Sequence, residues 1–136
     1  MFKLSILSRL KCNIPLMSLS NVVYRINCTE CKEFYIGKTY RRLSQRIKEH
    51  STCEYSALTK HAIMSNHIID FTNPEVLCRE SAHTRLLIKE TLKIKELQAY
   101  KSLNGNSGSF DLALFWYQHV VTQIVIASIY MFVSYV

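Results

Sequence analysis

A chain of 136 residues has room for one small domain, and a hydrophobic fraction of 49% is ordinary for a globular protein. The formal net charge of +7 suits a polyanionic partner such as nucleic acid, although a solvated basic surface would give the same value. Five cysteines, an odd number without regular spacing, exclude a fully paired disulfide framework and favour a reducing compartment. Arg9 and Lys11 interrupt the apolar start of the chain, so we expect no secretory signal.

The central region begins with the pattern of a β-hairpin. Residues 22–28 and 34–38 are short, β-branched and aromatic, and a polar connection separates them. Thr39 then has the side chain and position to cap a helix that runs to about His50.

Two helices and one strand are predicted in the rest of this region. Residues 56–64 predict a short helix that ends in a polar break at Asn66, and residues 71–77 predict an edge strand because they contain Pro74. Residues 81–100 form the longest helical pattern, and an Asn- and Gly-rich loop at 103–108 ends it. The order strand, strand, helix, helix, strand, helix predicts an α/β (α+β) domain, with a small three-stranded antiparallel sheet flanked by helices.

Composition divides the chain into an N-terminal extension at 1–20, a domain at 21–111 and an apolar tail at 112–136. The tail contains no Lys, Arg, Asp or Glu, and as a helix it is long enough to cross a hydrocarbon core of about 30 Å. It is therefore either a transmembrane helix, which would associate the protein with a membrane, or a degenerate terminus.

The last predicted helix carries a carboxylate on its apolar side. Leu86, Leu87, Ile94 and Leu97 share one face, and Glu90 falls in the middle of it. Burying this group is costly unless it is paired, protonated or bound to a cation. Taken alone, the pattern favours a salt bridge to a nearby Arg or Lys, or a helix rotated so that Glu90 sits at the edge of the core.

The helix after the hairpin has a basic face. Arg42, Arg46 and His50 recur every four residues beside the apolar positions Leu43 and Ile47. Two guanidiniums and an imidazole would clamp a phosphate and assist proton transfer, but an isolated run of this kind is more often a solvated face.

The hairpin and the two helices together resemble a known family. Residues 22–24, Val-Val-Tyr, and residues 35–37, Tyr-Ile-Gly, resemble the paired tripeptides of the GIY-YIG nuclease superfamily. The resemblance continues, in order, through Arg46, His50, Glu90 and Asn104. The short sequence segments around these positions look most like the endonuclease domain of Penelope-like retroelements. Val22 stands where the family usually has Gly, a departure that weakens the expectation of activity and leaves the expected fold unchanged.

This resemblance implies a metal-dependent DNA endonuclease that nicks DNA by hydrolysing phosphodiester bonds. Glu90 would hold one Mg²⁺, or Mn²⁺, together with water and the scissile phosphate. Arg46 would stabilise charge on the phosphate, and Tyr24 would orient or deprotonate the attacking water with help from Tyr35 and His50. The choice of base among these three stays open. Asn104 would fix the site or the phosphate backbone.

A second metal site is predicted from a separate set of side chains. Cys28 and Cys31 form C-x2-C, and His61 and His67 form H-x5-H, which together would supply a closed tetrahedral Zn²⁺ site that staples the hairpin to the second helix. The alternative is two surface thiols and two ordinary histidines. Such a set also resembles the animal Penelope-like endonucleases. The remaining candidates are interpreted as structural or incidental: Cys12, Cys53, Cys78, His83 and His119.

The resemblance also suggests partners and a location. DNA is the expected substrate, a reverse transcriptase domain is the expected neighbour in the parent element, and the nucleus is the expected compartment. The chain resembles an isolated endonuclease domain or an element fragment, which favours a degenerate terminus for the tail. Two other functions remain open: a catalytically inactive, zinc-stabilised nucleic-acid-binding module, and a small membrane-anchored protein with a vestigial nuclease domain.

Overall fold

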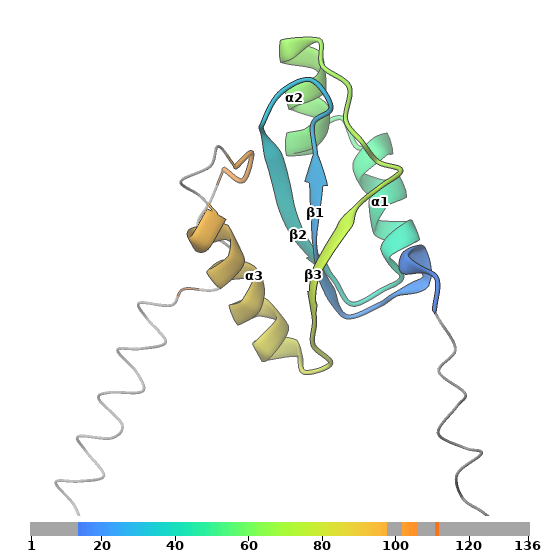
Figure 1. Cartoon of the computed structure of the whole chain (residues 1–136), viewed down its shortest axis with the longest axis vertical. Helices are drawn as coiled ribbons and strands as arrows, with labels where there is room; N and C mark the ends of the chain where they lie inside the picture. The colour runs from blue at the N-terminus through green and yellow to red at the C-terminus, as the bar shows by residue number, and fades with distance from the viewer. Residues whose placement is uncertain (1–13, 98–101, 106–110, 112–136) are drawn as a thin grey trace, which may run out of the picture.

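The computed structural model describes residues 14–97, 102–105 and 111, and within them it forms an α+β domain (Figure 1). The elements in chain order are a 3₁₀ helix, Leu16–Ser18, then β1 Val22–Asn27, β2 Phe34–Thr39, α1 Leu43–Thr52, α2 Ala57–Ser65, β3 Glu75–Arg79 and α3 His83–Leu97. The predicted order of three strands and three helices and the predicted fold class are confirmed.

The three strands form one antiparallel sheet with β1 in the centre, in the order β2-β1-β3. The register of β1 and β2 places Tyr24 opposite Gly37 and Arg25 opposite Ile36. β3 is an edge strand, as predicted, and begins directly after Pro74, which has no amide hydrogen to donate to a neighbour.

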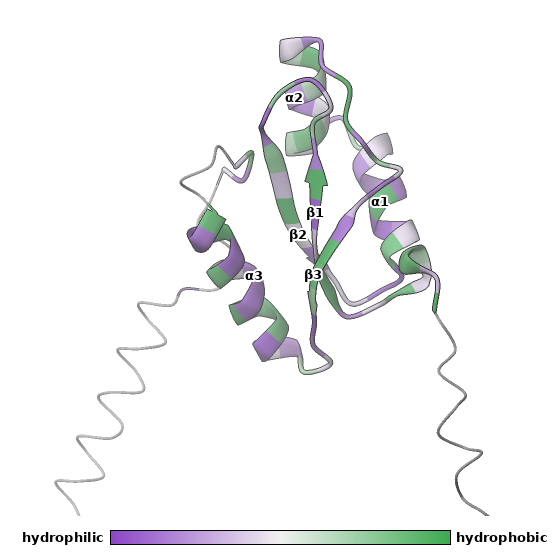
Figure 2. Cartoon of the chain, viewed as in Figure 1, coloured by the Kyte–Doolittle hydropathy of each residue, from purple (hydrophilic) through white to green (hydrophobic). Residues whose placement is uncertain are grey.

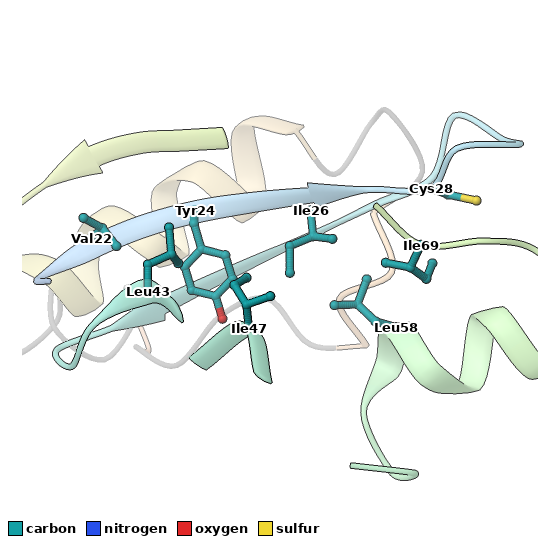
Figure 3. Packing of buried hydrophobic residues seen from close by; sticks show 8 residues of the cluster. All are labelled: Val22, Tyr24, Ile26, Cys28, Leu43, Ile47, Leu58 and Ile69. Atoms are coloured by element: carbon teal, nitrogen blue, oxygen red, sulfur yellow. The ribbon is translucent and has the colours of Figure 1, made fainter. Parts of the chain in front are cut away.

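Both faces of the sheet are covered, because side chains alternate between faces along each strand. Figure 1 shows α1 and α2 on one side of the sheet and α3 on the other. On the first side, Val22, Tyr24 and Ile26 pack with residues of the helices in one buried cluster (Figure 3), whose further members are Cys28, Leu43, Ile47, Leu58 and Ile69. The opposite cluster contains Val23, Phe34, Ile36, Leu86 and Ile94.

The start of α1 differs from the prediction that Thr39 would cap it. Thr39 is instead the last residue of β2, paired with Val22, and α1 begins at Leu43 with Arg42 at its N-cap. The Thr39 hydroxyl accepts a hydrogen bond from the Arg41 amide at 3.1 Å, so it stabilises the turn after the strand. Pairing with β1 therefore extends β2 beyond the end suggested by local sequence. β3 likewise lies four residues later than the segment predicted to begin at residue 71.

Part of the predicted N-terminal extension contacts the domain. Met17 and Leu19 pack against the cluster that contains Tyr24, and the Leu19 carbonyl accepts a hydrogen bond from the Leu43 amide at 2.8 Å. Figure 2 shows hydrophilic and hydrophobic residues alternating along α3. Among the described residues, none of the helices has the length and hydropathy to cross a membrane. The apolar tail at 112–136 lies outside the described residues.

Gly37 lies beneath the rings of two tyrosines. A Cβ atom at this position would come within 2.7 Å of Tyr24 Oη and 2.8 Å of Tyr35 Cε1. The Tyr24 side chain is fully buried, so its ring has little room to withdraw. The absence of a side chain at Gly37 therefore allows the Tyr24 ring to lie across β2.

We predict that Gly37→Ala destabilises the domain by about 1–3 kcal/mol, because the added methyl group overpacks the space under the two rings. Thermal or urea unfolding measures this loss. Gly105→Ala is the matched control, since no described atom lies within 4 Å of its added Cβ. Equal stability of the two variants would contradict the close packing over Gly37.

Candidate active site and candidate metal centre

Five of the six predicted site residues line one cavity of about 770 Å³: Tyr35, Arg46, His50, Glu90 and Asn104. Tyr35 and Tyr24 lie on the sheet face that α1 covers, since Tyr24 pairs with Gly37 in the β1–β2 register. Glu90 comes from α3 on the opposite face. The cavity therefore wraps around the β2 edge of the sheet and receives side chains from both layers.

The sixth residue, Tyr24, does not line the cavity itself but contacts His50, which does. Its hydroxyl lies 2.8 Å from His50 Nε2, and His50 Nδ1 lies 3.1 Å from the Ser56 hydroxyl. The Tyr35 ring meets the His50 ring edge-on, with centroids 5.0 Å apart. Sequence reasoning missed the contact of Ser56, which sits just before α2 and looks like an ordinary helix cap.

Burial sets the protonation of this pair. Desolvation, with the positive charge of Arg46 as a further cause, lowers the pKa of His50 to about 4. Desolvation, with a smaller effect of Tyr35, raises the pKa of Tyr24 above its ordinary value. At neutral pH the phenol therefore keeps its proton and the imidazole is uncharged, so His50 has one ring nitrogen able to accept a proton.

Arg46 presents its guanidinium to the cavity. Its Nη1 donates to Glu49 Oε2 at 3.0 Å, and Arg41 Nη2 holds the other oxygen of Glu49 at 2.7 Å. The Nε–H of Arg46 is buried and has no hydrogen-bond partner within the described part of the chain. Arg42, which shared the predicted basic face, is exposed at the N-cap of α1 and does not line the cavity.

Glu90 is buried at the cavity wall and forms an ion pair with β2. Its exposed fraction is 6%, and Lys38 Nζ donates to its Oε2 at 2.7 Å. The predicted salt bridge to a nearby Lys is confirmed, and it offsets the cost of burying the carboxylate. Lys38 was missed as the partner, although strand alternation places it on the same face as Ile36, toward α3.

Asn104 uses its side-chain amide on the sheet. Its Oδ1 accepts from the Ile36 amide at 2.9 Å, and its Nδ2 donates to the Ile36 carbonyl at 2.7 Å. The Leu103 amide donates to the Phe34 carbonyl at 2.7 Å, so residues 102–105 run along the edge of β2. Asn104 thus fixes the wall of the site.

Cys28, Cys31, His61 and His67 come together at the far end of the hairpin. Their four ligand atoms all lie within 4.8 Å of one another, a set that could hold a metal ion. Cys31 Sγ is 3.5 Å from His61 Nε2, Cys28 Sγ is 3.7 Å from His67 Nδ1, and the two imidazole nitrogens are 3.3 Å apart. The predicted link between the hairpin and α2 is present in the structure.

Carboxylates lie behind both histidines of this cluster. Glu33 Oε2 is 3.0 Å from His61 Nδ1, and Glu30 Oε2 is 3.9 Å from His67 Nε2. The nitrogen of each ring that faces away from the cluster thus meets an acidic side chain, an arrangement common behind metal-bound histidines.

The other cysteines and histidines belong neither to the predicted catalytic set nor to the Cys–His cluster, or they lie outside the described residues. Cys53 is exposed and Cys78 is half-buried, and both are free thiols. His83 stacks on Tyr40 with ring centroids 4.4 Å apart. Cys12 and His119 fall in parts of the chain that the structure does not describe.

Comparison with known proteins gives one family. The model of the GIY-YIG catalytic domain matches residues 20–104. The chain belongs to the GIY-YIG family. No curated protein and no solved structure matches it.

The departure from the GIY-YIG tripeptide at Val22 is a change in the core. The Val22 side chain is fully buried in the cluster shared with Leu43 and Ile47, away from the residues that line the cavity. Its neighbour Tyr24 keeps the contact with His50. The family position that differs thus supplies apolar packing beneath α1.

We predict that His50 makes the domain less stable in acid. Between its folded pKa of about 4 and its ordinary value of about 6.5, the unfolded chain binds a proton at His50 that the folded chain does not. Stability should therefore fall as the pH drops through this window, by up to about 3 kcal/mol at 1.36 kcal/mol per pKa unit.

Urea unfolding between pH 7 and pH 4 measures this slope. His50→Gln provides the comparison, because it removes this titration and leaves His61 and His67 in place. The slope should be smaller in the variant. Equal slopes in the two proteins would show that His50 is not held in its neutral form.

Proposed function

We propose that this GIY-YIG domain is a DNA endonuclease that hydrolyses one phosphodiester bond at a time, with Mg²⁺ or Mn²⁺ as cofactor. The observation that carries the proposal is the convergence of Tyr35, Arg46, His50 and Glu90 on one cavity at the β2 edge. A carboxylate, a guanidinium and a tyrosine–histidine pair are the groups that metal-assisted phosphodiester hydrolysis needs.

The residues present fit a hard divalent cation. Glu90 offers carboxylate oxygens at the wall of a cavity open enough to admit water and a phosphate. Lys38 forms an ion pair with this carboxylate at 2.7 Å, which compensates for the burial of its charge. When bound, the cation would polarise the phosphate and stabilise charge on the departing oxygen.

Arg46 fits the phosphate itself. Its side chain lines the cavity and is 36% exposed, so part of the guanidinium is open to a substrate. A guanidinium binds phosphate with two parallel donors. Glu49 holds the other end of the guanidinium and so orients it toward the substrate.

Tyr24 and His50 fit the transfer of a proton from the attacking water. The base stays open among Tyr24, Tyr35 and His50, because Tyr24 is fully buried and does not line the cavity. With Tyr24 as base, its oxygen would take the proton of a water that reaches it while its own proton passes to His50 Nε2, 2.8 Å away. The neutral imidazole becomes an imidazolium, and the water becomes the nucleophile that displaces the 3′ or 5′ oxygen of the DNA strand. Because burial raises the pKa of Tyr24, the phenol keeps its own proton, and it could take a proton from water only if His50 accepts that one.

The metal cluster supports a finer assignment to the Penelope-like endonucleases. A set of two cysteines and two histidines, with the cysteines between the two tripeptides, resembles the arrangement in animal Penelope-like endonucleases. In a parent element of this type the nick would provide a 3′ hydroxyl group to a reverse transcriptase domain, and the substrate would be nuclear DNA.

The Lys38–Glu90 ion pair also favours a second candidate function. If Lys38 held the carboxylate permanently, the domain would bind nucleic acid through its basic surface and Arg46 without cutting it. The experiment on Glu90 distinguishes the two functions, because cutting and binding are measured separately.

We predict that Glu90→Gln lowers nicking of supercoiled plasmid by on the order of a hundredfold or more, since it removes the carboxylate that would hold the cation. Nicking by the wild-type chain should require Mg²⁺ or Mn²⁺ and stop in EDTA. Glu96→Gln, an exposed position on the same helix, is the control and should cut like the wild type.

DNA binding of both variants is followed by gel shift in Ca²⁺. If wild type and Glu90→Gln bind DNA equally and neither cuts, the domain is a binding module and the catalytic assignment is wrong.

We propose further that the ion held by the cluster is Zn²⁺ and that its role is structural. A tetrahedral zinc with Zn–S of about 2.3 Å and Zn–N of about 2.0–2.1 Å separates its ligand atoms by about 3.3–3.8 Å. The three separations of 3.3, 3.5 and 3.7 Å between ligand atoms match this tetrahedron. Four protein ligands would leave no open position for a reacting water.

We predict that the purified chain contains one zinc per molecule and that Cys31→Ser loses it. The link that the zinc would form between the hairpin and α2 would also be lost. A decrease of about 2 kcal/mol in the free energy of unfolding would lower the Tm by roughly 8–16 °C in a domain of this size. Elemental analysis and thermal unfolding measure the two effects. Cys53→Ser should change neither, because Cys53 is an exposed free thiol, and full metal retention in Cys31→Ser would overturn the site.

A further inference from the structure

Ser56 stands at the N-cap of α2 but does not cap it. Serine is among the preferred N-cap residues because its oxygen accepts a hydrogen bond from a backbone amide in the first turn, which is worth about 1 kcal/mol. In α2, all of whose residues are described, Ser56 makes no such side-chain bond. Its hydroxyl lies instead 3.1 Å from His50 Nδ1.

This contact occupies the second nitrogen of a ring whose first nitrogen already faces Tyr24. A neutral imidazole carries one N–H, so one of its two nitrogens must donate and the other accept. Two arrangements are compatible with the distances alone: a proton on Nδ1 directed at Ser56, or a proton on Nε2 directed at the Tyr24 oxygen.

The buried Tyr24 hydroxyl decides between them. The Tyr24 side chain is fully buried, and leaving the proton of a buried hydroxyl without an acceptor is costly. Within the described contacts, His50 Nε2 is the acceptor within reach of that proton.

We propose that Ser56 is a positioning residue that holds His50 in the tautomer with its proton on Nδ1, leaving Nε2 to accept the proton of Tyr24. The inference rests on the proposed nuclease function for its purpose, but the tautomer itself can be observed without any catalysis. The Ser56 oxygen accepts the Nδ1–H both before and after His50 gains its second proton at Nε2. The ring therefore keeps its orientation throughout the transfer.

The backbone around this contact keeps the two side chains in place. The Ser56 amide donates to the Cys53 carbonyl at 3.1 Å, closing a tight turn between α1 and α2. The hydroxyl of Thr59 donates to the His50 carbonyl at 3.1 Å. The end of α1 and the first turn of α2 are thus tied together at both the backbone and the ring of His50.

The test is the ¹⁵N NMR spectrum of the full-length chain, with His50 assigned by its loss in His50→Gln. In the wild type at neutral pH we expect Nδ1 to be protonated and Nε2 to be unprotonated. Ser56→Ala should move the population toward the Nε2–H form. Ser56→Thr, which restores a hydroxyl group, should bring the wild-type spectrum back. Ser51→Ala, at an exposed position on α1, is the control.

Nicking of plasmid in Mg²⁺ provides the second readout. Ser56→Ala and Ser56→Gly should each cut about tenfold more slowly or worse, with DNA binding unchanged and with activity recovered in Ser56→Thr. Ser56→Gly serves as the second variant because glycine is also accepted at an N-cap.

The outcomes separate this inference from the nuclease function. An Nε2–H tautomer in the wild type, or an Nδ1–H tautomer that persists in Ser56→Ala and Ser56→Gly, would overturn the role of Ser56 whether or not the protein cuts DNA. A wild-type chain that shows the Nδ1–H tautomer but does not cut would leave Ser56 as assigned and reject the nuclease function.

Discussion

The antiparallel pairing of β1 with β2, in the register that sets Tyr24 opposite Gly37, determines where the groups of the site lie. A shift of one residue would move each side chain of a strand to the other face of the sheet. If β2 shifted in this way, Tyr35 would face α3 instead of His50, and Ile36 or Lys38 would lie opposite Tyr24. The close fit of the Tyr24 ring over Gly37 opposes such a shift, because a neighbouring residue under the ring would bring a Cβ into the same space.

The same pairing explains why the site is built at an edge. β2 has β1 on one side only, so its other side is open to helices from both layers. α1 brings Arg46 and His50 over one face, and α3 brings Glu90 over the other, where Lys38 meets it. An exposed strand edge is also a risk for association with other chains, and the bonds of Asn104 to Ile36 cover part of it.

Much of this could be predicted from the sequence, because the decisive signals were local or periodic. Helical spacing placed Glu90 among apolar residues, and the paired tripeptides placed the two tyrosines on neighbouring strands. What failed depended on contacts between distant segments. Thr39 has the side chain of a helix cap, but pairing with Val22 kept it in the strand. The sequence predicts Ser56 as the start of a helix and does not reveal the contact of its hydroxyl with His50 of the preceding helix.

The partner of Glu90 shows the same limit. A carboxylate on an apolar face requires compensation, but only the approach of α3 to β2 identifies Lys38 as the group that supplies it. The Cys and His set was predictable from short spacings within each half. Whether the two halves meet depends on the distance between the hairpin and α2, and the spacing of residues within each half does not predict that distance.

β1 and α2 are joined at two places, and this links the two sites physically. At one place, His50 bridges Tyr24 of β1 and Ser56 at the start of α2. At the other, Cys28, directly after β1, meets His67, while Cys31 meets His61 of α2. The five residues from Ser56 to His61 span about 7–8 Å of helix, and the four from Tyr24 to Cys28 about 13 Å of strand. A strand and a helix held at two such separated points can rotate relative to each other only about the line that joins those points, so the contacts of the cluster restrict the direction from which Ser56 approaches His50.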